Sequence, residues 1–263
     1  MSLFSKADMP AFRRDRLVSA VQTYFPSGGM PSDDFLLQQV QAAEQDVIVA
    51  LKVFLEPTTI FPYTPSNTEI TALNGSPWAE EPGYDYDADF FQGERWGYIV
   101  TRQRPIISIS AINFVYPSPQ NSVYQIPNDW LRIDKKYGHI RMVPASSTFI
   151  APLGAFLLQA LAGGGTIPSM LQVHYVAGLS NTLTAWPNII DLIYKTAILK
   201  ILKGFYIPQS QSISADGLSQ SITFDASKFQ ADLNETMFGP KGSNAGLYTA
   251  IHGLSNTAMG ITV

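Results

Sequence analysis

Residues 187–206 read PNIIDLIYKTAILKILKGFY, and residues 209–229 follow as QSQSISADGLSQSITFDASKF. Apolar residues recur every three to four positions in the first stretch, which predicts a helix with one apolar face. Pro187 suits the first turn of this helix, and Gly204 and Pro208 supply its end. The second stretch is poor in charge and carries no reactive side chain. A helix followed by such a segment indicates a protein that docks on other proteins, and not an enzyme. The apolar face comprises Ile189, Ile190, Ile193, Ala197, Ile201 and Leu202.

The composition limits the possible functions. The 263 residues carry a net charge of -4, and only 14% of them are charged whereas 46% are hydrophobic. Soluble domains average about 25% charged residues, so we expect partner subunits to cover much of this surface. An acidic chain is unsuited to gripping nucleic acid by its phosphates, although it can surround DNA without binding it. The lack of cysteine excludes disulfides, thiolate zinc sites and cysteine nucleophiles.

Neither the N-terminal segment nor the most apolar run of the sequence indicates insertion into a membrane. The N-terminal MSLFSKADMPAFRRDR lacks the apolar core and cleavage site of a signal peptide, which predicts synthesis in the cytoplasm. The most apolar run, AFLLQALA at 155–162, is far shorter than the roughly 20 residues that a bilayer requires. We therefore expect no membrane contact, and a loop pressed on a neighbouring subunit through Leu157, Leu158 and Leu161. A loop that touches a membrane is the alternative.

Two helices are predicted at the N-terminus. The first is short and covers 13–25. The second begins at PSDD (31–34), which combines an N-cap serine with acidic residues, and continues until Pro57. Its apolar residues at helical spacing are Leu36, Val40, Ala43, Val47, Ala50, Leu51 and Phe54.

From residue 57 to 183 the apolar period shortens toward two, which predicts a small antiparallel β domain inserted between helices that pack together. We expect Ile107, Ile109 and Ala111 to share one face of a strand. The turn KKYG should join a hairpin in which Leu131 and Ile133 face Ile140 and Met142. The strand-forming segments are RPIISISAINFVY at 104–116, DWLRIDKKYGHIRMV at 129–143 and MLQVHYVAGL at 170–179.

The C-terminal region after residue 205 has weaker periodicity. A short helix at 227–237 is predicted, with Phe229, Leu233 and Met237 on one side. The remainder, 238–263, is rich in Gly, Ser and Asn, so it cannot bury enough apolar area to offset its own ordering entropy. We expect this tail to order against another protein, and a chain that ends before Pro208 to stay folded.

The residues that could carry chemistry form no recognisable catalytic motif. His139, His174 and His252 have no second histidine or carboxylate at ligand spacing, and we expect His139 on the solvent face of its hairpin. The three Gly-Leu-Ser triplets do not extend to GxSxG, and GGGTIPS and GPKGS lack the spacing of a P-loop. The sequence therefore predicts no enzyme and no cofactor.

One acidic run deserves comparison with a cation site. In AEEPGYDYDADFFQGER (79–95), Asp85, Asp87 and Asp89 alternate as at the start of a calcium loop. However, Phe90 stands where such a loop needs glycine, and Trp96 stands where its closing glutamate belongs. A solvated loop, or a negative patch facing a basic neighbour, is the favoured interpretation.

The acidic run and the aromatic residues around it also suit a second class of function. Aromatic side chains exposed in a groove and interspersed with acids would suit a tail-associated carbohydrate-binding or hydrolytic protein, whereas buried ones would belong to a core. The aromatics concerned are Trp78, Tyr84, Tyr86, Trp96 and Tyr98.

The order of these parts resembles the head-tail connector (adaptor) proteins of tailed bacteriophages. The likeness covers the second helix to Phe229, and its most specific phrases are RPIISISAINFVYP, IPNDWLRIDKKYGHIRMVP, VHYVAGL and ISADGLSQSITFD. The resemblance implies a structural protein of the virion neck, made in the host cytoplasm. It also implies a ring, usually of twelve copies, between the portal and a stopper or hub protein of the tail. Genomic DNA would pass through the ring without specific binding.

The predicted fold class is thus α+β. An adaptor-like helical bundle is expected from 1–56 and 184–206, with the β domain at 57–183 and an extended C-terminal arm at 207–263. The smallest connectors lack such a β insertion and long tail. The resemblance assigns portal binding to the arm residues Phe224, Phe229, Leu233, Met237 and Phe238. Subunit or tail contacts are expected at Leu247 and Tyr248 as well as at the three leucines of the apolar loop.

Overall fold

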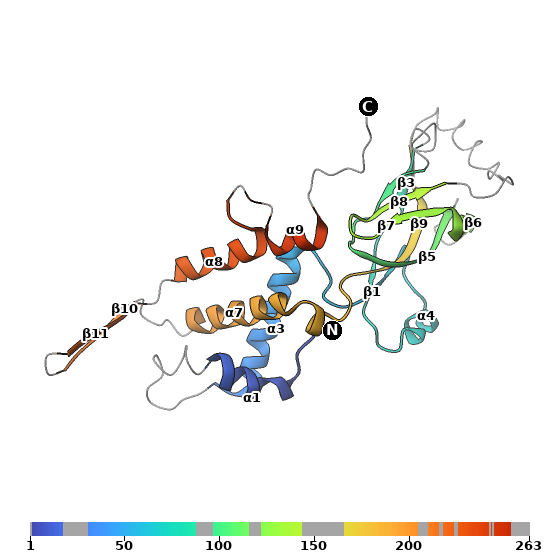
Figure 1. Ribbon diagram of the computed structural model, residues 1–263. Helices are drawn as coiled ribbons and strands as arrows, with labels where there is room; N and C mark the ends of the chain where they lie inside the picture. Colours follow the sequence, from blue (N-terminus) through green and yellow to red (C-terminus); the bar gives the residue numbers. More distant parts are fainter. Residues whose placement is uncertain are drawn as a thin grey trace. The chain divides into compact units, whose positions relative to one another are not determined.

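The computed structural model describes residues 2–17, 31–87, 97–115, 122–143, 166–204, 210–215, 218–223, 226–241, 243 and 245–253. Helices and sheets are both present, which confirms the α+β class (Figure 1). The chain divides into two compact units. The helical unit comprises residues 1–52 and 181–263, and the β unit comprises residues 53–180.

The two main helices of the helical unit lie where the sequence predicts them. Helix α3 (Asp33–Leu51) begins after Ser32, whose side chain accepts a hydrogen bond from the Phe35 amide, and ends before Lys52 in the left-handed conformation. Helix α7 (Pro187–Gly204) follows the short helix α6 (Thr182–Ala185). Of the predicted N-terminal helix 13–25, only the π-helical turn η2 (Arg13–Leu17) lies in the described residues, after a 3-10 turn η1 (Lys6–Asp8) and α1 (Met9–Phe12).

The core of the helical unit forms where α3 crosses α7 (Figure 1), and both apolar faces are buried there. The N-terminal segment closes one side of this core, because the ring of Tyr194 on α7 stacks on Phe12 and lies 5.2 Å from Phe4. The buried carboxylate of Glu44 on α3 accepts hydrogen bonds from the Ser2 hydroxyl and the Leu3 amide. These contacts attach the start of the chain to its central helices.

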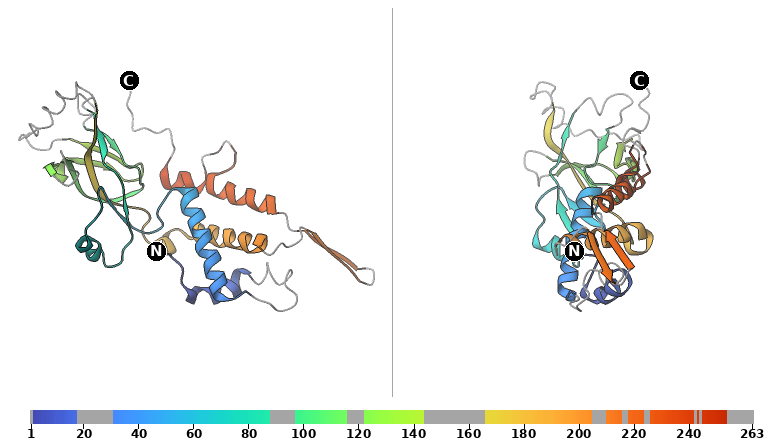
Figure 2. Two further views of the ribbon diagram at one scale, coloured as in Figure 1. Left: turned by 180° about the vertical axis from the view of Figure 1, so that it is seen from behind. Right: turned by 90° about the vertical axis from the view of Figure 1, so that its left-hand side faces the viewer.

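The C-terminal helices belong to the same unit. Helix α8 (Ala226–Phe238) agrees with the predicted helix at 227–237, and Figures 1 and 2 show it beside α7. A further short helix, α9 (Leu247–His252), packs against α8. Between α7 and α8 lie strands β10 (Ser210–Ala215) and β11 (Leu218–Thr223), which form a two-stranded sheet.

The β unit contains two sheets. The larger has the order β2-β1-β9-β5-β6, with β3 paired to β9, and the smaller has the order β4-β8-β7. All described pairings in this unit are antiparallel except β1 with β2, which run parallel, so the predicted purely antiparallel domain is corrected at this edge. The strands are β1 (Thr58–Phe61), β2 (Trp78–Glu80), β3 (Tyr84–Tyr86), β4 (Ile99–Val100), β5 (Ile106–Val115), β6 (Ser122–Gln125), β7 (Leu131–Asp134), β8 (His139–Met142) and β9 (Ile167–Ala177), with helix α4 (Asn67–Ala72) after β1 and the 3-10 turn η5 (Asn128–Trp130) before β7.

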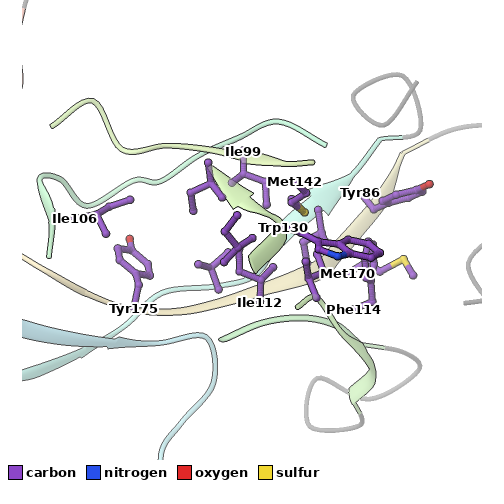
Figure 3. Packing of buried hydrophobic residues seen from close by; sticks show 14 of the residues in the cluster. Tyr86, Ile99, Ile106, Ile112, Phe114, Trp130, Met142, Met170 and Tyr175 are labelled. Atoms are coloured by element: carbon purple, nitrogen blue, oxygen red, sulfur yellow. The ribbon is translucent and has the colours of Figure 1, made fainter. Parts of the chain in front are cut away.

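Side chains from both sheets share one hydrophobic core (Figure 3). The predicted hairpin is confirmed, since Leu131 pairs with Met142 and Ile133 with Ile140 across a turn at 135–138. The predicted face of β5 is confirmed in part. Ile107, Ile109 and Ala111 are half-buried and alternate with exposed Ser108 and Ser110, and Ile109 packs against the core. Two register irregularities against β9 interrupt the alternation, and the buried side chains of the strand are Ile106, Ile112, Phe114 and Val115.

Candidate functional site

The strongest candidate for a docking element is the sheet formed by β10 and β11. The two strands pair antiparallel over their full length, from Ser210 opposite Thr223 to Ala215 opposite Leu218. Neither outer edge pairs with any other described strand, and both strands are uncharged. A lone two-stranded hairpin is marginally stable in water at best, and a free strand edge is a template for another chain. The Asp216-Gly217 pair, a strong two-residue hairpin signal, identifies this element in the sequence, although the sequence analysis treats the segment only as an arm.

The residues assigned to portal binding fall into two groups. Phe224 lies outside the described residues. On α8, Leu233 is 2% exposed and Met237 8% exposed, because this helix packs on the helical unit. Phe229 is half-buried, and Phe238, at 46% exposure, lies with its ring 6.1 Å from that of Tyr248. Leu233 and Met237 are therefore core residues of their own chain and cannot also serve as portal contacts in this arrangement.

The tail is likewise corrected over its described part. Leu247 and Ile251 are buried, and the ring Nε2 of His252 lies 2.7 Å from the carbonyl oxygen of Leu51, where the carbonyl accepts the hydrogen bond. Tyr248 packs its ring 4.7 Å from that of His252 and is half-buried. Residues 226–253 thus order against the helical unit and need no foreign protein to do so. A chain that ends before Pro208 lacks these contacts, so we expect it to be less stable than the full-length protein. That such a chain stays folded remains a prediction.

The predicted apolar loop gives no structural information. Leu157, Leu158 and Leu161 lie outside the described residues. Among the residues described, no helix combines the length and apolar character that crossing a bilayer needs.

Charges on the helical unit are arranged in pairs. Arg13 contacts Asp33, and Lys6 lies 2.7 Å from Asp34. On α7, the carboxylate of Asp191 forms ion pairs with the Arg16 guanidinium, at 2.9 Å, and with the Lys195 ammonium, at 2.7 Å. Pairing with acids leaves these cations poorly suited to hold phosphates, which requires clustered and uncompensated positive charge.

The predicted cation candidates do not converge in the described part of the chain. Asp85 accepts a hydrogen bond from the Ser169 amide at 2.9 Å, and Asp89 lies outside the described residues. Asp87 is half-buried and has an interaction of its own. Within the described ranges, no three His, Cys, Asp or Glu side chains come together as a metal site requires.

His139 contradicts its predicted place on the solvent face, because it is 7% exposed. Strand β4 extends the hairpin into a three-stranded sheet by pairing beside β8, with Val100 opposite His139. The rings of Tyr98 and Tyr137 lie 5.3 and 5.9 Å from the His139 ring. Burial lowers the pKa of His139, an effect that Asp134 opposes and Arg104 and Arg141 support. The neutral ring is a packing element of the smaller sheet.

The most connected polar cluster in the β unit surrounds the buried carboxylate of Glu81. The hydroxyls of Tyr84 and Tyr175 both donate to it, the latter at 2.9 Å. Each hydroxyl also accepts a backbone hydrogen bond, Tyr84 from Arg102 at 2.9 Å and Tyr175 from Gln103 at 3.2 Å. Burial raises the pKa of both tyrosines. Glu81 adds to this shift at Tyr84, and Tyr84 and Glu81 add to it at Tyr175. The hydroxyls thus stay protonated and fully engaged, so the cluster acts as a structural link between β9 and the loops beside β3 and β5.

The aromatic residues considered for carbohydrate stacking are separated by the fold. Trp78 is 40% exposed on β2, whereas Tyr86 is buried in the core. The Arg102 guanidinium lies over the Tyr84 ring, 4.3 Å from its centroid, and the Tyr98 ring packs on His139. Trp96 lies outside the described residues. The described members therefore do not share one exposed groove.

Comparison of the sequence with models of known protein families and with curated proteins finds no match.

Proposed function

We propose that this protein is a head-tail connector of a tailed bacteriophage, a non-catalytic subunit that forms a ring between portal and tail. In this proposal the helical unit forms the adaptor-like wall of the ring, and the hairpin β10–β11 docks on the portal. The β unit is an insertion on that wall. The observation that supports the proposal most directly is the pair of uncharged strands β10 and β11, which form a sheet of their own.

The hairpin suits docking because neither of its outer edges pairs with another described strand. Two strands alone bury little surface and leave a row of unpaired backbone groups on each outer edge. Addition of a strand from a partner would satisfy one edge by backbone hydrogen bonds and would not require charge. Phe238, the one predicted portal contact on α8 that is not buried or half-buried, lies at the opposite end of that helix from the hairpin. Its exposed ring could add a separate apolar contact.

The charge distribution is compatible with a DNA channel. The ion pairs of the helical unit include Arg13 with Asp33 and Lys200 with Asp46, and the whole chain is acidic. The helical unit itself is nearly neutral, with ten basic and eleven acidic residues. A wall without excess positive charge does not hold phosphates and would let the genome slide, provided that it faces the channel.

Replacement of residues 209–224 by a flexible Gly-Ser linker tests the proposal. The variant should keep the helical circular dichroism of the parent, since α7 and α8 stay connected, but should fail to join tailless capsids that carry the cognate portal. Co-sedimentation and electron microscopy measure the binding. Leu183→Ala, which removes an exposed apolar side chain elsewhere on the helical unit, is the matched control and should bind normally. Normal capsid binding by the hairpin-less chain would overturn the assignment of the docking element.

A further inference from the structure

The β unit contains a polar hollow that connector function does not use. It has a volume of about 560 Å³, and its lining includes Tyr63, Thr64, Ser66, Glu69, Asn113 and Gln172. Volumes of roughly 300–1,000 Å³ are typical of pockets that hold small molecules. The first four residues come from the segment between β1 and the start of α4, whereas Asn113 lies on β5 and Gln172 on β9.

Asn113 and Gln172 lie on the face of the sheet that points away from the hydrophobic core. Their neighbours along the strands, Ile112 with Phe114 and Leu171 with Val173, belong to the core, and successive side chains of a strand point to opposite faces. The two amides are direct cross-strand partners. Strand pairing therefore sets two primary amides side by side at the floor of the hollow.

The amide of Gln172 is the strongest sign of a built site. The residue is only 3% exposed, yet within the described part of the chain neither its side chain nor that of Asn113 has a hydrogen-bond partner. Each amide offers an acceptor oxygen and two donor hydrogens. Both residues line the hollow, so their amides are suited to a ligand that supplies both donors and acceptors.

The opposite wall is fixed by its own hydrogen bonds. Glu69 accepts from the Tyr63 hydroxyl at 2.7 Å, and from both the amide and the hydroxyl of Ser66 at 2.8 Å. The backbone hydrogen bond from Ser66, followed by the Tyr63 and Ser66 hydroxyls, lowers the pKa of Glu69, while burial and Glu69 raise the pKa of Tyr63 to about 12. The carboxylate is thus charged, already engaged and held in place at the start of α4.

This lining excludes several ligand classes. No lysine or arginine is among the described lining residues, so a phosphate or another anion would meet only the negative charge of Glu69. A single, engaged carboxylate is a poor site for a metal ion, which takes several oxygen ligands. A peptide that binds by adding a strand would need a free strand edge, whereas Asn113 and Gln172 lie on strands that are already paired. We infer that the hollow binds a neutral saccharide, whose hydroxyls both donate and accept hydrogen bonds.

Titration calorimetry and saturation-transfer NMR on the full-length protein test this inference. The probes are maltose and N,N′-diacetylchitobiose as free sugars, dextran as a polymeric glycan, and N-acetylneuraminic acid as the anionic comparison. We expect saturable binding of at least one neutral probe with a millimolar or lower Kd. Binding of the disaccharides alone would identify a free sugar as the ligand, and binding of dextran as well would identify a glycan chain.

Three variants locate the binding. Gln172→Leu and Asn113→Ala should each weaken it at least tenfold. Gln125→Ala removes the amide that pairs with Asn113 from the other side, on β6, but does not line the hollow, and it should bind as the parent does. Thermal unfolding checks each fold, and if Gln172→Leu unfolds, Asn113→Ala decides. Absence of binding to every neutral probe, preference for the anionic sugar, or binding unaffected by both variants would overturn the inference. The hairpin-less chain should still bind sugar, which separates this test from that of portal docking.

Discussion

The helical unit and the β unit assemble their cores from different parts of the chain. The β unit is continuous, and its two ends meet, because the Leu179 amide donates to the Phe54 carbonyl at 2.9 Å. The helical unit is discontinuous: its core joins Phe12 near the N-terminus, α3, α7 and Ile251 near the C-terminus. The β unit also buries more polar groups, such as Glu81 and Gln172. Damage to the helical core should therefore affect both ends of the chain, because residues 1–52 and 181–263 share that core, whereas damage to the β unit should stay within residues 53–180.

The largest effect is expected from Leu233→Ala. Leu233 is the most deeply buried side chain of α8, and loss of a buried leucine typically costs about 2–5 kcal/mol. Urea unfolding followed by far-ultraviolet circular dichroism should show this loss in the helical transition, with the β unit unchanged.

Asn234→Ala, at the exposed neighbouring position, is the control and should change stability by no more than about 0.5 kcal/mol. A loss below about 1 kcal/mol in Leu233→Ala would mean that α8 leaves the helical unit in solution, and the contrast between core helix and docking hairpin would fail.

A smaller effect, confined to the β unit, is expected from Tyr175→Phe. Without its hydroxyl, one oxygen of the buried Glu81 and the Gln103 amide lose a hydrogen-bond partner, which costs about 1–3 kcal/mol. Calorimetry of the full chain should show a lower Tm for the β transition and an unchanged helical transition. Tyr98→Phe is the matched control. An equal effect of both variants would show that the hydroxyl of Tyr175 contributes no more than that of Tyr98, and that the Glu81 cluster adds no specific stability.

The same contrast explains which features the sequence could predict. Helices α3 and α7 carry local signals, the Ser32 cap and the Pro187 start, and these signals act within a few residues. The face of β5 depends on irregularities in its pairing with β9, which arise only when two distant segments meet. Helix α8 is predictable for the same local reason, whereas its packing against α7 is a tertiary contact between separate segments.

The candidate sites show the same difference between local signals and contacts of distant segments. The Asp216-Gly217 signal makes the hairpin predictable in principle, since it lies within the element. The hollow is not predictable, because Asn113 and Gln172 become neighbours only through the register of β5 on β9. Burial of His139 is not predictable either, since the alternation within its hairpin does not reveal that β4 pairs beside β8 or that the Tyr98 ring packs on His139.

The smallest effect is expected from pH, and it too should separate the two units. Burial lowers the pKa of His139 and of His174, although Glu69 opposes the shift at the second residue. Unfolding exposes both rings, whose ordinary pKa is about 6.5, so the unfolded chain binds protons that the folded chain does not. The stability of the β unit should therefore be complete above about pH 6.5 and should fall as the pH drops toward the lowered pKa values. His139→Gln cannot take up a proton, so its Tm should fall less between pH 7 and pH 5 than that of the parent, with the remainder due to His174. If both proteins lose the same Tm over this range, His139 is not buried as a neutral ring, and the distinction between a polar β core and an apolar helical core loses one of its supports.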